Sequence, residues 1–120
     1  MVQVSTRVDV ADNTGARIAQ CIRVYGSSLA IPGMLIVVSV KRALARRKIS
    51  KGDVLTGVVA TSRRILARKT GGQIKSDFNT IIMVKKSELE PLSNRVLFPV
   101  YIELRRGGFS KIVSLAHDVV

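Results

Sequence analysis

The chain has 120 residues, of which 47% are hydrophobic, and its 20 Lys and Arg side chains against 8 Asp and Glu give a net charge of +12. This length suits one core that removes most of the unfolded surface from water, so we expect a single domain over residues 1–120. The apolar content excludes a disordered tail, and the charge indicates a polyanionic partner.

Alternation of apolar and polar residues predicts five strands, because successive side chains of a strand point to opposite faces. We expect these strands at residues 2–10, 16–24, 34–40, 54–61 and 80–84. In the second strand, one face should carry Ile18, Ile22 and Val24, and the other Arg17 and Arg23. Regularly spaced short strands favour a small closed barrel, since closure removes exposed edges.

The connections between these strands carry turn residues and, in one case, a long polar hairpin arm. Asp12 begins an Asp-Asn-Thr-Gly turn, where an aspartate side chain commonly bonds its own backbone. The arm contains Gly71 and Gly72 and separates the fourth and fifth strands. Towards the C-terminus, residues 101–106 predict one or two helical turns.

The sequence gives no sign of a membrane span or of a targeting segment. The longest apolar run, residues 29–38, is half of the roughly 20 residues that span a bilayer, and it contains Pro32 and Gly33. The first residues carry acids among alternating residues, unlike a secretory signal or a transit peptide. Cys21 is the only cysteine, which excludes an internal disulfide and a four-cysteine metal site and favours a reducing compartment.

The sequence contains no motif that indicates an enzyme, a cofactor or a metal. Nucleophilic catalysis needs a base beside the nucleophile, and nothing brings Cys21 and His117 together. We expect Cys21 to be a small buried hydrophobic residue and His117 to lie at the surface. Asp9 and Asp12 resemble an acid–base pair only in spacing. A structural role for Asp12, bonding its own turn backbone, explains its position better. No phosphate-binding loop, dinucleotide-binding or zinc-protease pattern occurs.

Basic residues concentrate in one stretch of the chain. Residues 41–75 hold eleven basic side chains against one acid, Asp53, whereas the remaining residues hold nine basic and seven acidic groups. One cluster lies at the end of the third strand and in the following loop, and the other lies in the arm. We expect neighbouring strands to bring both onto one basic surface that binds RNA phosphates. These cations are Lys41, Arg42, Arg46, Arg47, Lys48, Lys51, Arg63, Arg64, Arg68, Lys69 and Lys75.

Aromatic residues are scarce and lie mostly outside this basic stretch. Proteins that bind single-stranded RNA stack bases on several aromatic rings, which this chain lacks there. We therefore expect structured RNA recognised by shape and charge. Three of the five rings, those of Phe98, Tyr101 and Phe109, should cap the core.

Six short motifs, in the right order and at nearly the right spacing, resemble those of the family of universal large-subunit ribosomal protein fourteen. They cover residues 10–16 (VADNTGA), 21–24 (CIRV), 51–54 (KGDV), 98–100 (FPV), 103–105 (ELR) and 111–116 (KIVSLA). The resemblance covers essentially the whole chain. It implies a mainly β fold, a small closed five-stranded barrel with a protruding basic hairpin and a short helical C-terminal region. It also implies a structural constituent of the large ribosomal subunit that supports translation without catalysis.

The same resemblance implies the partners of the chain. These are large-subunit rRNA near the subunit interface, the neighbouring ribosomal proteins three and nineteen, small-subunit rRNA through an intersubunit bridge, and no membrane. In related systems a ribosome silencing factor binds the same exposed face. By analogy with the basic hairpin and loop of the family, rRNA contact is assigned to Arg17, Arg23, Lys41, Arg42, Arg46, Arg47, Lys48, Arg63, Arg64, Arg68 and Lys69.

The sequence departs from the family pattern at three places. Met34 stands where an acidic residue usually follows the glycine. Residues 76–79 read Ser-Asp-Phe-Asn in place of Phe-Asp-Gly-Asn, and residues 93–95 read Ser-Asn-Arg in place of Gly-Thr-Arg. This divergence favours a ribosome of the mitochondrial matrix over a bacterial or plastid ribosome.

Two other functions compete with this interpretation. A free barrel-type chaperone or regulator that binds single-stranded RNA transiently would need stacking aromatic rings on the barrel. An enzyme built on a small barrel would need convergent acids or a metal site. The scarcity of both features favours the rRNA-bound protein.

Overall fold

The computed structural model describes residues 2–45, 49–64, 66–67, 71–85, 90–93, 95–106, 108–116 and 119–120. The elements within these residues follow one another along the chain as strands and then helices. In order they are β1 (Arg7–Val10), β2 (Ala16–Val24), β3 (Leu35–Ala43), β4 (Val54–Thr61), β5 (Leu66–Ala67), β6 (Gln73–Ile74), β7 (Thr80–Lys85), β8 (Glu90–Pro91), α1 (Glu103–Arg106) and α2 (Ser110–Leu115).

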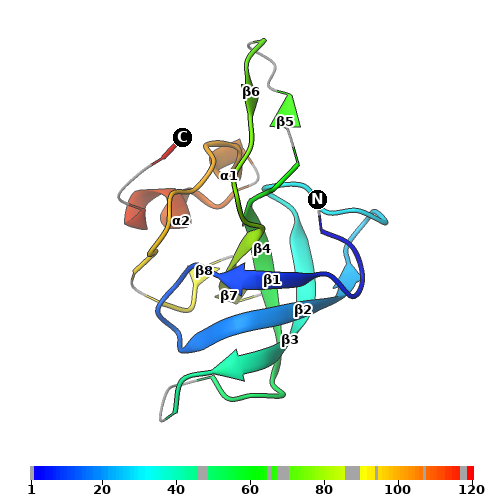
Figure 1. Cartoon of the computed structure of the whole chain (residues 1–120). Coiled ribbons are helices and arrows are strands. Elements are labelled where there is room, and N and C mark those ends of the chain that lie inside the picture. Colours follow the sequence, from blue (N-terminus) through cyan, green and yellow to red (C-terminus); the bar gives the residue numbers. More distant parts are fainter. Residues whose placement is uncertain are drawn as a thin grey trace.

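Five of the strands close into a barrel (Figure 1). The order is β1-β2-β3-β4-β7 with antiparallel neighbours, and β1 returns to β7 in a parallel pairing at Val10 and Ile81. Closure leaves β1 and β7 without a long free edge, which is the advantage expected of a barrel over a flat sheet. The short β8 pairs with the other end of β7, at Lys85 and Glu90, outside the barrel. The predicted five-stranded barrel is confirmed.

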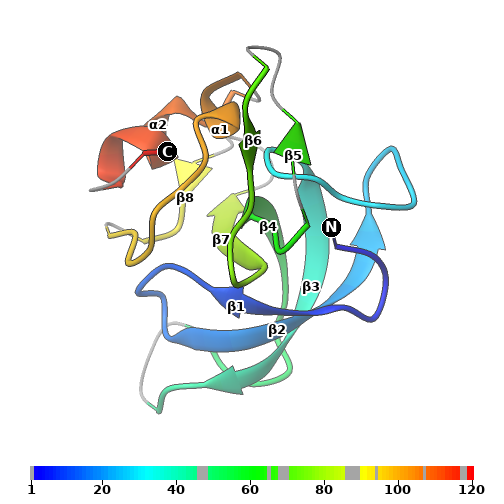
Figure 2. The same cartoon turned by 45° about the horizontal axis from the view of Figure 1, so that its top comes forward.

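The predicted hairpin arm is also confirmed. It leaves the barrel after β4 and returns into β7, and its strands β5 and β6 pair antiparallel at Leu66 and Ile74. Figures 1 and 2 show this hairpin projecting beyond the end of the barrel. The projection fits the elongated dimensions of 44 × 28 × 28 Å.

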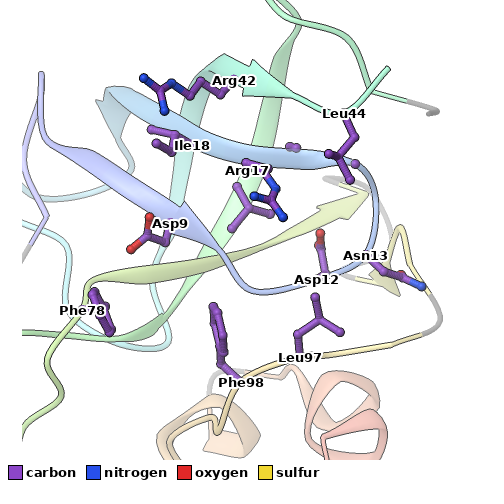
Figure 3. Close-up of a pocket in the computed structure, with 13 residues that line it drawn as sticks. Asp9, Asp12, Asn13, Arg17, Ile18, Arg42, Leu44, Phe78, Leu97 and Phe98 are labelled. Carbon is purple, nitrogen blue, oxygen red and sulfur yellow. The ribbon is translucent and has the colours of Figure 1, made fainter. Parts of the chain in front are cut away.

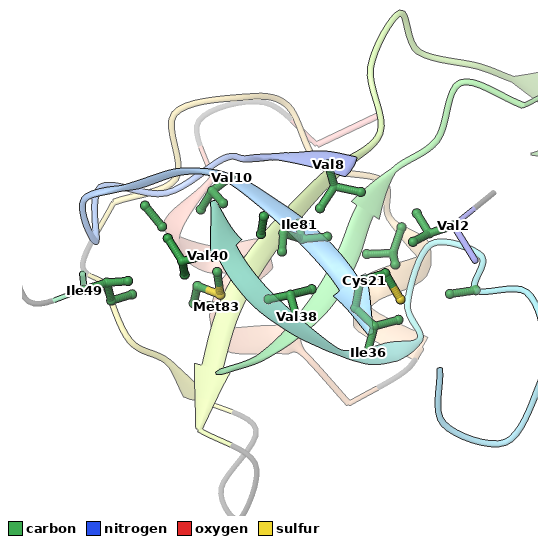
Figure 4. Packing of buried hydrophobic residues seen from close by; sticks show 14 residues of the cluster. Val2, Val8, Val10, Cys21, Ile36, Val38, Val40, Ile49, Ile81 and Met83 are labelled. Carbon is green, nitrogen blue, oxygen red and sulfur yellow. The ribbon is translucent and has the colours of Figure 1, made fainter. Parts of the chain in front are cut away.

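The inside of the barrel is filled by apolar side chains (Figure 4). They come from alternate positions of the strands, as the twofold periodicity of a strand requires. Cys21 is among them with no exposed surface, which confirms its predicted role as a small buried hydrophobic residue. The cluster includes Val2, Val8, Val10, Cys21, Ile36, Val38, Val40, Ile49, Ile81 and Met83.

A second apolar cluster lies outside the barrel, between the sheet and the two helices. In β7, Ile81 and Met83 belong to the inner cluster, whereas Ile82 and Val84 belong to the outer one. Because both faces of β7 are buried, its sequence is continuously apolar instead of alternating. The helical region contributes Tyr101, Leu104, Phe109, Ile112 and Val113 to this outer cluster.

Gly33 forms part of the junction between the barrel and the helical region. Its φ of +95° is one that residues with a Cβ adopt at a cost, and a Cβ added to it would lie 3.4 Å from the backbone oxygen of Glu103. The Gly33 amide donates to the carbonyl of Val59 at 2.8 Å. The turn before β3 therefore fixes both the entry into the barrel and the approach of α1.

The first strand is shorter than the alternation of valines predicts. Ser5 has a φ of +75°, a left-handed conformation that no strand contains, and Val4 next to it is 56% exposed. β1 therefore begins only at Arg7, and Val2 forms a separate bridge with Ala30. The prediction of one strand over residues 2–10 is wrong for its first part.

The second strand does not keep the predicted two faces. Its pairing with β3 shifts register between Ala16 and Ile18, between Ile18 and Ala19, and between Cys21 and Arg23. Each irregularity turns the following side chains relative to the sheet. As a result Ile22 is 45% exposed beside the exposed Arg23, so the prediction that Ile22 shares a buried face is wrong.

Near the C-terminus the predicted helical turn is present as α1, a single turn. The second helix, α2, follows after Phe109. Tyr101 and Phe109 are 1% and 2% exposed, which confirms that they cap the core. Phe98 is 46% exposed, so the same prediction is wrong for it.

Candidate nucleic-acid interface

The turn between β1 and β2 is held by one buried carboxylate. Asp12 is 3% exposed and accepts hydrogen bonds from the Thr14 amide at 3.2 Å, the Thr14 hydroxyl at 2.7 Å and the Met83 amide at 2.9 Å. Burial raises the pKa of Asp12 above its usual value, and these hydrogen bonds offset part of the rise. The carboxylate thus fastens the turn to β7, which confirms the predicted structural use of Asp12.

Beyond this turn the surface is hollowed into a pocket with a volume of about 540 Å³. Arg17 of β2 and Arg42 of β3 line it, and Arg42 is the register partner of Ile18, the neighbour of Arg17. Phe78, from the segment that returns from the arm, and Phe98, from the segment before α1, line it as well. Figure 3 shows Phe98 rising from its loop towards β1, with Arg17 on the other side of the pocket.

The cations of this pocket are available to an external anion. Arg17 and Arg42 are both exposed. The carboxyl group of Asp9 lines the same pocket, but among the described residues no carboxylate forms an ion pair with either arginine. Their positive charge is therefore not neutralised within the described part of the molecule.

A second cationic site lies at the base of the arm, directly after β4. The Arg63 amide donates to the side-chain oxygen of Asn79 at 2.9 Å, and the Arg64 amide donates to the Ser62 hydroxyl at 3.2 Å. Below them, the hydroxyl groups of Thr61 and Thr80 lie 2.7 Å apart. These contacts fix the backbone of both arginines, while their side chains are exposed.

The two remaining described residues of the predicted rRNA-contact set lie along the β2–β3 ladder. Arg23 is exposed, and its guanidinium carbon lies 5.2 Å from the centre of the Tyr25 ring, a cation–π distance. Its register partner is Val37, near the start of β3. Lys41 is only half-buried and lies near the far end of β3.

The expectation that the two basic clusters form one surface stays a prediction, because five of their eleven cations lie outside the described residues. The loop that follows β3 enters β4 at Val54, whereas the arm leaves β4 after Thr61. Seven steps of about 3.3 Å separate these ends by roughly 23 Å. Figures 1 and 2 accordingly show the end of β3 and the arm at opposite ends of the barrel.

Five of the predicted contact residues lie outside the described residues. They are Arg46, Arg47 and Lys48 in the loop after β3, and Arg68 and Lys69 in the arm. His117 also lies outside them, so its predicted surface position is untested.

The described residues do not assemble a centre for chemistry. Burial raises the pKa of the Cys21 thiol, which disfavours the reactive thiolate. No group of three His, Cys, Asp or Glu side chains among the described residues gathers closely enough to hold a metal ion. Over the same part of the chain, no helix has the length and apolar character needed to cross a membrane.

Sequence reasoning missed the apolar members of the pocket. Leu44, Phe78 and Leu97 are 42%, 59% and 59% exposed, and they come from three separate connections. Nothing in the local pattern of one segment shows that another will lie beside it. The one sequence feature that pointed to this pocket was the departure from the family pattern at Phe78, where a glycine is usual.

The departure at Met34 has a local structural role. The Met34 sulfur lies 3.5 Å from the Ile31 amide, and the Met34 amide donates to the Ile31 carbonyl at 3.1 Å. The side chain is half-buried and packs against the inner cluster. A thioether thus takes the place of the usual carboxylate in closing this turn.

The comparison with known protein families agrees with these observations. The sequence matches the family described as Ribosomal protein L14p/L23e over residues 1–120. Members of this family are structural proteins of the large ribosomal subunit, associated with the ribosome and its rRNA. The match confirms the resemblance carried by the six motifs, and the barrel and arm fit it. The chain therefore belongs to the L14p/L23e family of large-subunit ribosomal proteins.

Proposed function

We propose that this chain binds large-subunit rRNA through the exposed cations of its barrel and arm, and holds the folded RNA in place without catalysis. One observation supports this most strongly. Arg17, Arg42 and Arg63 are exposed, and none of them forms an ion pair among the described residues. An arginine without a carboxylate partner keeps its fork of N–H donors for phosphate oxygens.

The separation of the two basic sites adds to this function. Phosphate contacts position a protein without reading the base sequence. Contacts through Arg17 and Arg42 on β2 and β3, together with contacts through Arg63 and Arg64 at the base of the arm, fix the direction of the barrel on the RNA as well as its place. The same set of contacts includes Arg23 and Lys41, and the cations outside the described residues.

Family resemblance supports a more detailed placement. We propose a site near the subunit interface, beside ribosomal proteins three and nineteen, with a bridge to small-subunit rRNA and a face open to a ribosome silencing factor. Residues 76–79 and 93–95 depart from the family pattern, so contacts made there are particular to this chain. The same departures support assignment to a mitochondrial ribosome, which fractionation of organelles with a tagged chain tests.

Sedimentation in a sucrose gradient tests the rRNA-binding function. The tagged wild-type chain should travel with large subunits in moderate salt. The double variant Arg63→Ala/Arg64→Ala should shift towards the top of the gradient, because two phosphate contacts are removed. A matched control, Arg7→Ala/Lys85→Ala, removes two exposed charges from strands β1 and β7 and should sediment like the wild type. Free wild-type protein at the top of the gradient would contradict the proposal.

A further inference from the structure

The pocket beside the β1–β2 turn combines two kinds of side chain that a soluble surface seldom brings together. Phe78 and Phe98 expose 59% and 46% of their surface there, and Leu97 exposes 59%. Arg17 and Arg42 line the same pocket from two adjacent strands. The pocket thus offers apolar and aromatic surface together with cations.

The exposure of these rings is not explained by the core. Tyr101 and Phe109, in the neighbouring helical region, are almost fully buried. Phe98 and Phe78 instead lie at the pocket, on segments that follow different strands. Exposed apolar groups clustered around a hollow are typical of a surface that another molecule covers.

We propose that this pocket receives one unstacked nucleotide of the rRNA, an inference that rests on the proposed rRNA binding. The base lies against the rings of Phe78 and Phe98, and Arg17 and Arg42 bind the phosphate. Bulged or looped nucleotides of RNA are recognised in this way, by stacking on aromatic rings together with contacts to the backbone. The volume of about 540 Å³ lies in the range of pockets that bind small organic groups.

Asp9 adds a preference among the bases. Its side chain lines the pocket, and its amide donates to the carbonyl of Asn79 at 3.0 Å, which fixes its place beside the base of the arm. A carboxylate accepts hydrogen bonds and cannot donate them. The favoured base is therefore one with an exocyclic amino group, as in adenine, cytosine or guanine, which offers two N–H donors, over uracil, which offers only its ring N3–H.

A nucleotide suits the pocket better than a segment of a neighbouring protein. A protein segment would have to supply an acidic group and an apolar side chain in the right spacing, whereas a nucleotide carries a phosphate and a flat base as one unit. The chain carries a net charge of +12, which favours a polyanion at any exposed cationic site. Crosslinking in the assembled particle distinguishes a nucleotide from a protein segment in the pocket.

Binding of two RNA duplexes tests this pocket directly. One duplex carries a single bulged adenosine, the other is fully paired, and fluorescence anisotropy gives both affinities. The wild type should prefer the bulged duplex by at least about fivefold, the lower end of what stacking on one ring contributes. Phe98→Ala should abolish this preference without weakening binding of the paired duplex. The control Ile102→Ala removes a side chain of similar exposure, 44%, outside the pocket and should keep the preference.

Two further binding measurements separate the contributions of charge and base. Arg17→Ala/Arg42→Ala should weaken binding of the bulged duplex more than binding of the paired one. Circular dichroism should show that this variant keeps the fold of the wild type. A bulged uridine should bind less tightly than a bulged adenosine to the wild type, and this difference in affinity should narrow in Asp9→Ala, where only the difference in stacking remains. Equal binding of bulged and paired duplexes by the wild type would overturn the pocket proposal alone, because rRNA binding through other cations would still be measured.

Photochemical crosslinking identifies the occupant in the assembled particle. A photoreactive phenylalanine analogue at position 98, in a chain incorporated into large subunits, should form an adduct with rRNA. An adduct with a ribosomal protein would overturn the proposal in favour of a polypeptide occupant. Failure of the chain to enter large subunits would instead contradict the proposed rRNA binding, so the two failures are distinguishable.

Discussion

The Asp12 carboxylate is the polar group on which the β1–β2 turn depends, and its removal should destabilise the whole barrel. Asp12→Ala leaves the Met83 amide, in a strand residue with 0% exposure, without an acceptor. An unsatisfied buried donor costs about 1–3 kcal/mol, and the two lost bonds from Thr14 add to this. Relief of carboxylate burial offsets part of the loss, so we expect a net loss of about 2–3 kcal/mol.

Urea unfolding followed by circular dichroism at pH 7 measures this loss. Such a change is a large share of the roughly 5–15 kcal/mol that stabilise a typical domain. The control is Asp53→Ala, since Asp53 accepts one bond, from the exposed Ser50 amide at 3.0 Å, and its loss should cost about 1 kcal/mol or less. If both variants lose the same stability, the carboxylate of Asp12 does not fasten the turn to β7 as described.

Three further predictions concern stability and reactivity. The folded state raises the pKa of Asp12, so it favours the protonated form of this side chain. The difference in unfolding free energy between the wild type and Asp12→Ala should therefore be largest below pH 3.8 and decrease as the pH rises through the raised pKa. Urea titrations at several pH values measure this difference. Gly57→Ala should lower the free energy of unfolding by about 1–3 kcal/mol, since a Cβ there would lie 3.3 Å from the Ile81 side chain and the Ile82 oxygen. Gly72→Ala, with open space around it, should change the midpoint of urea unfolding little. Iodoacetamide should label the buried Cys21 only over the urea range in which the barrel unfolds; labelling in native buffer would show that the thiol is accessible.

The barrel was predictable from sequence because its strands carry an unambiguous apolar pattern. The limits of β4 agree with the predicted residues 54–61, where turn residues precede the strand. The exceptions arise where the backbone breaks the period. The left-handed φ of Ser5 and the register shifts near Cys21 move valine and isoleucine side chains to the surface, and neither has a local sequence signal.

The candidate interface was predictable only in part. Composition identified the cations, and Arg17, Arg42 and Arg63 are exposed as predicted. The relative placement of the basic connections was not predictable from spacing, because the loop before β4 and the arm after it are close in sequence and roughly 23 Å apart in space. The pocket was not predictable either, since Phe78 and Phe98 line it together only through the tertiary fold.

The salt dependence of binding to rRNA extracted from large subunits tests the central claim most directly. The logarithm of the wild-type association constant should fall linearly with the logarithm of the salt concentration. Each lost phosphate contact should reduce the steepness of this line by about 0.7–0.9, so Arg63→Ala/Arg64→Ala should bind more weakly with a slope shallower by about 1.5. An affinity that does not depend on salt, or a double variant with the wild-type slope and affinity, would contradict binding of rRNA phosphates by these arginines.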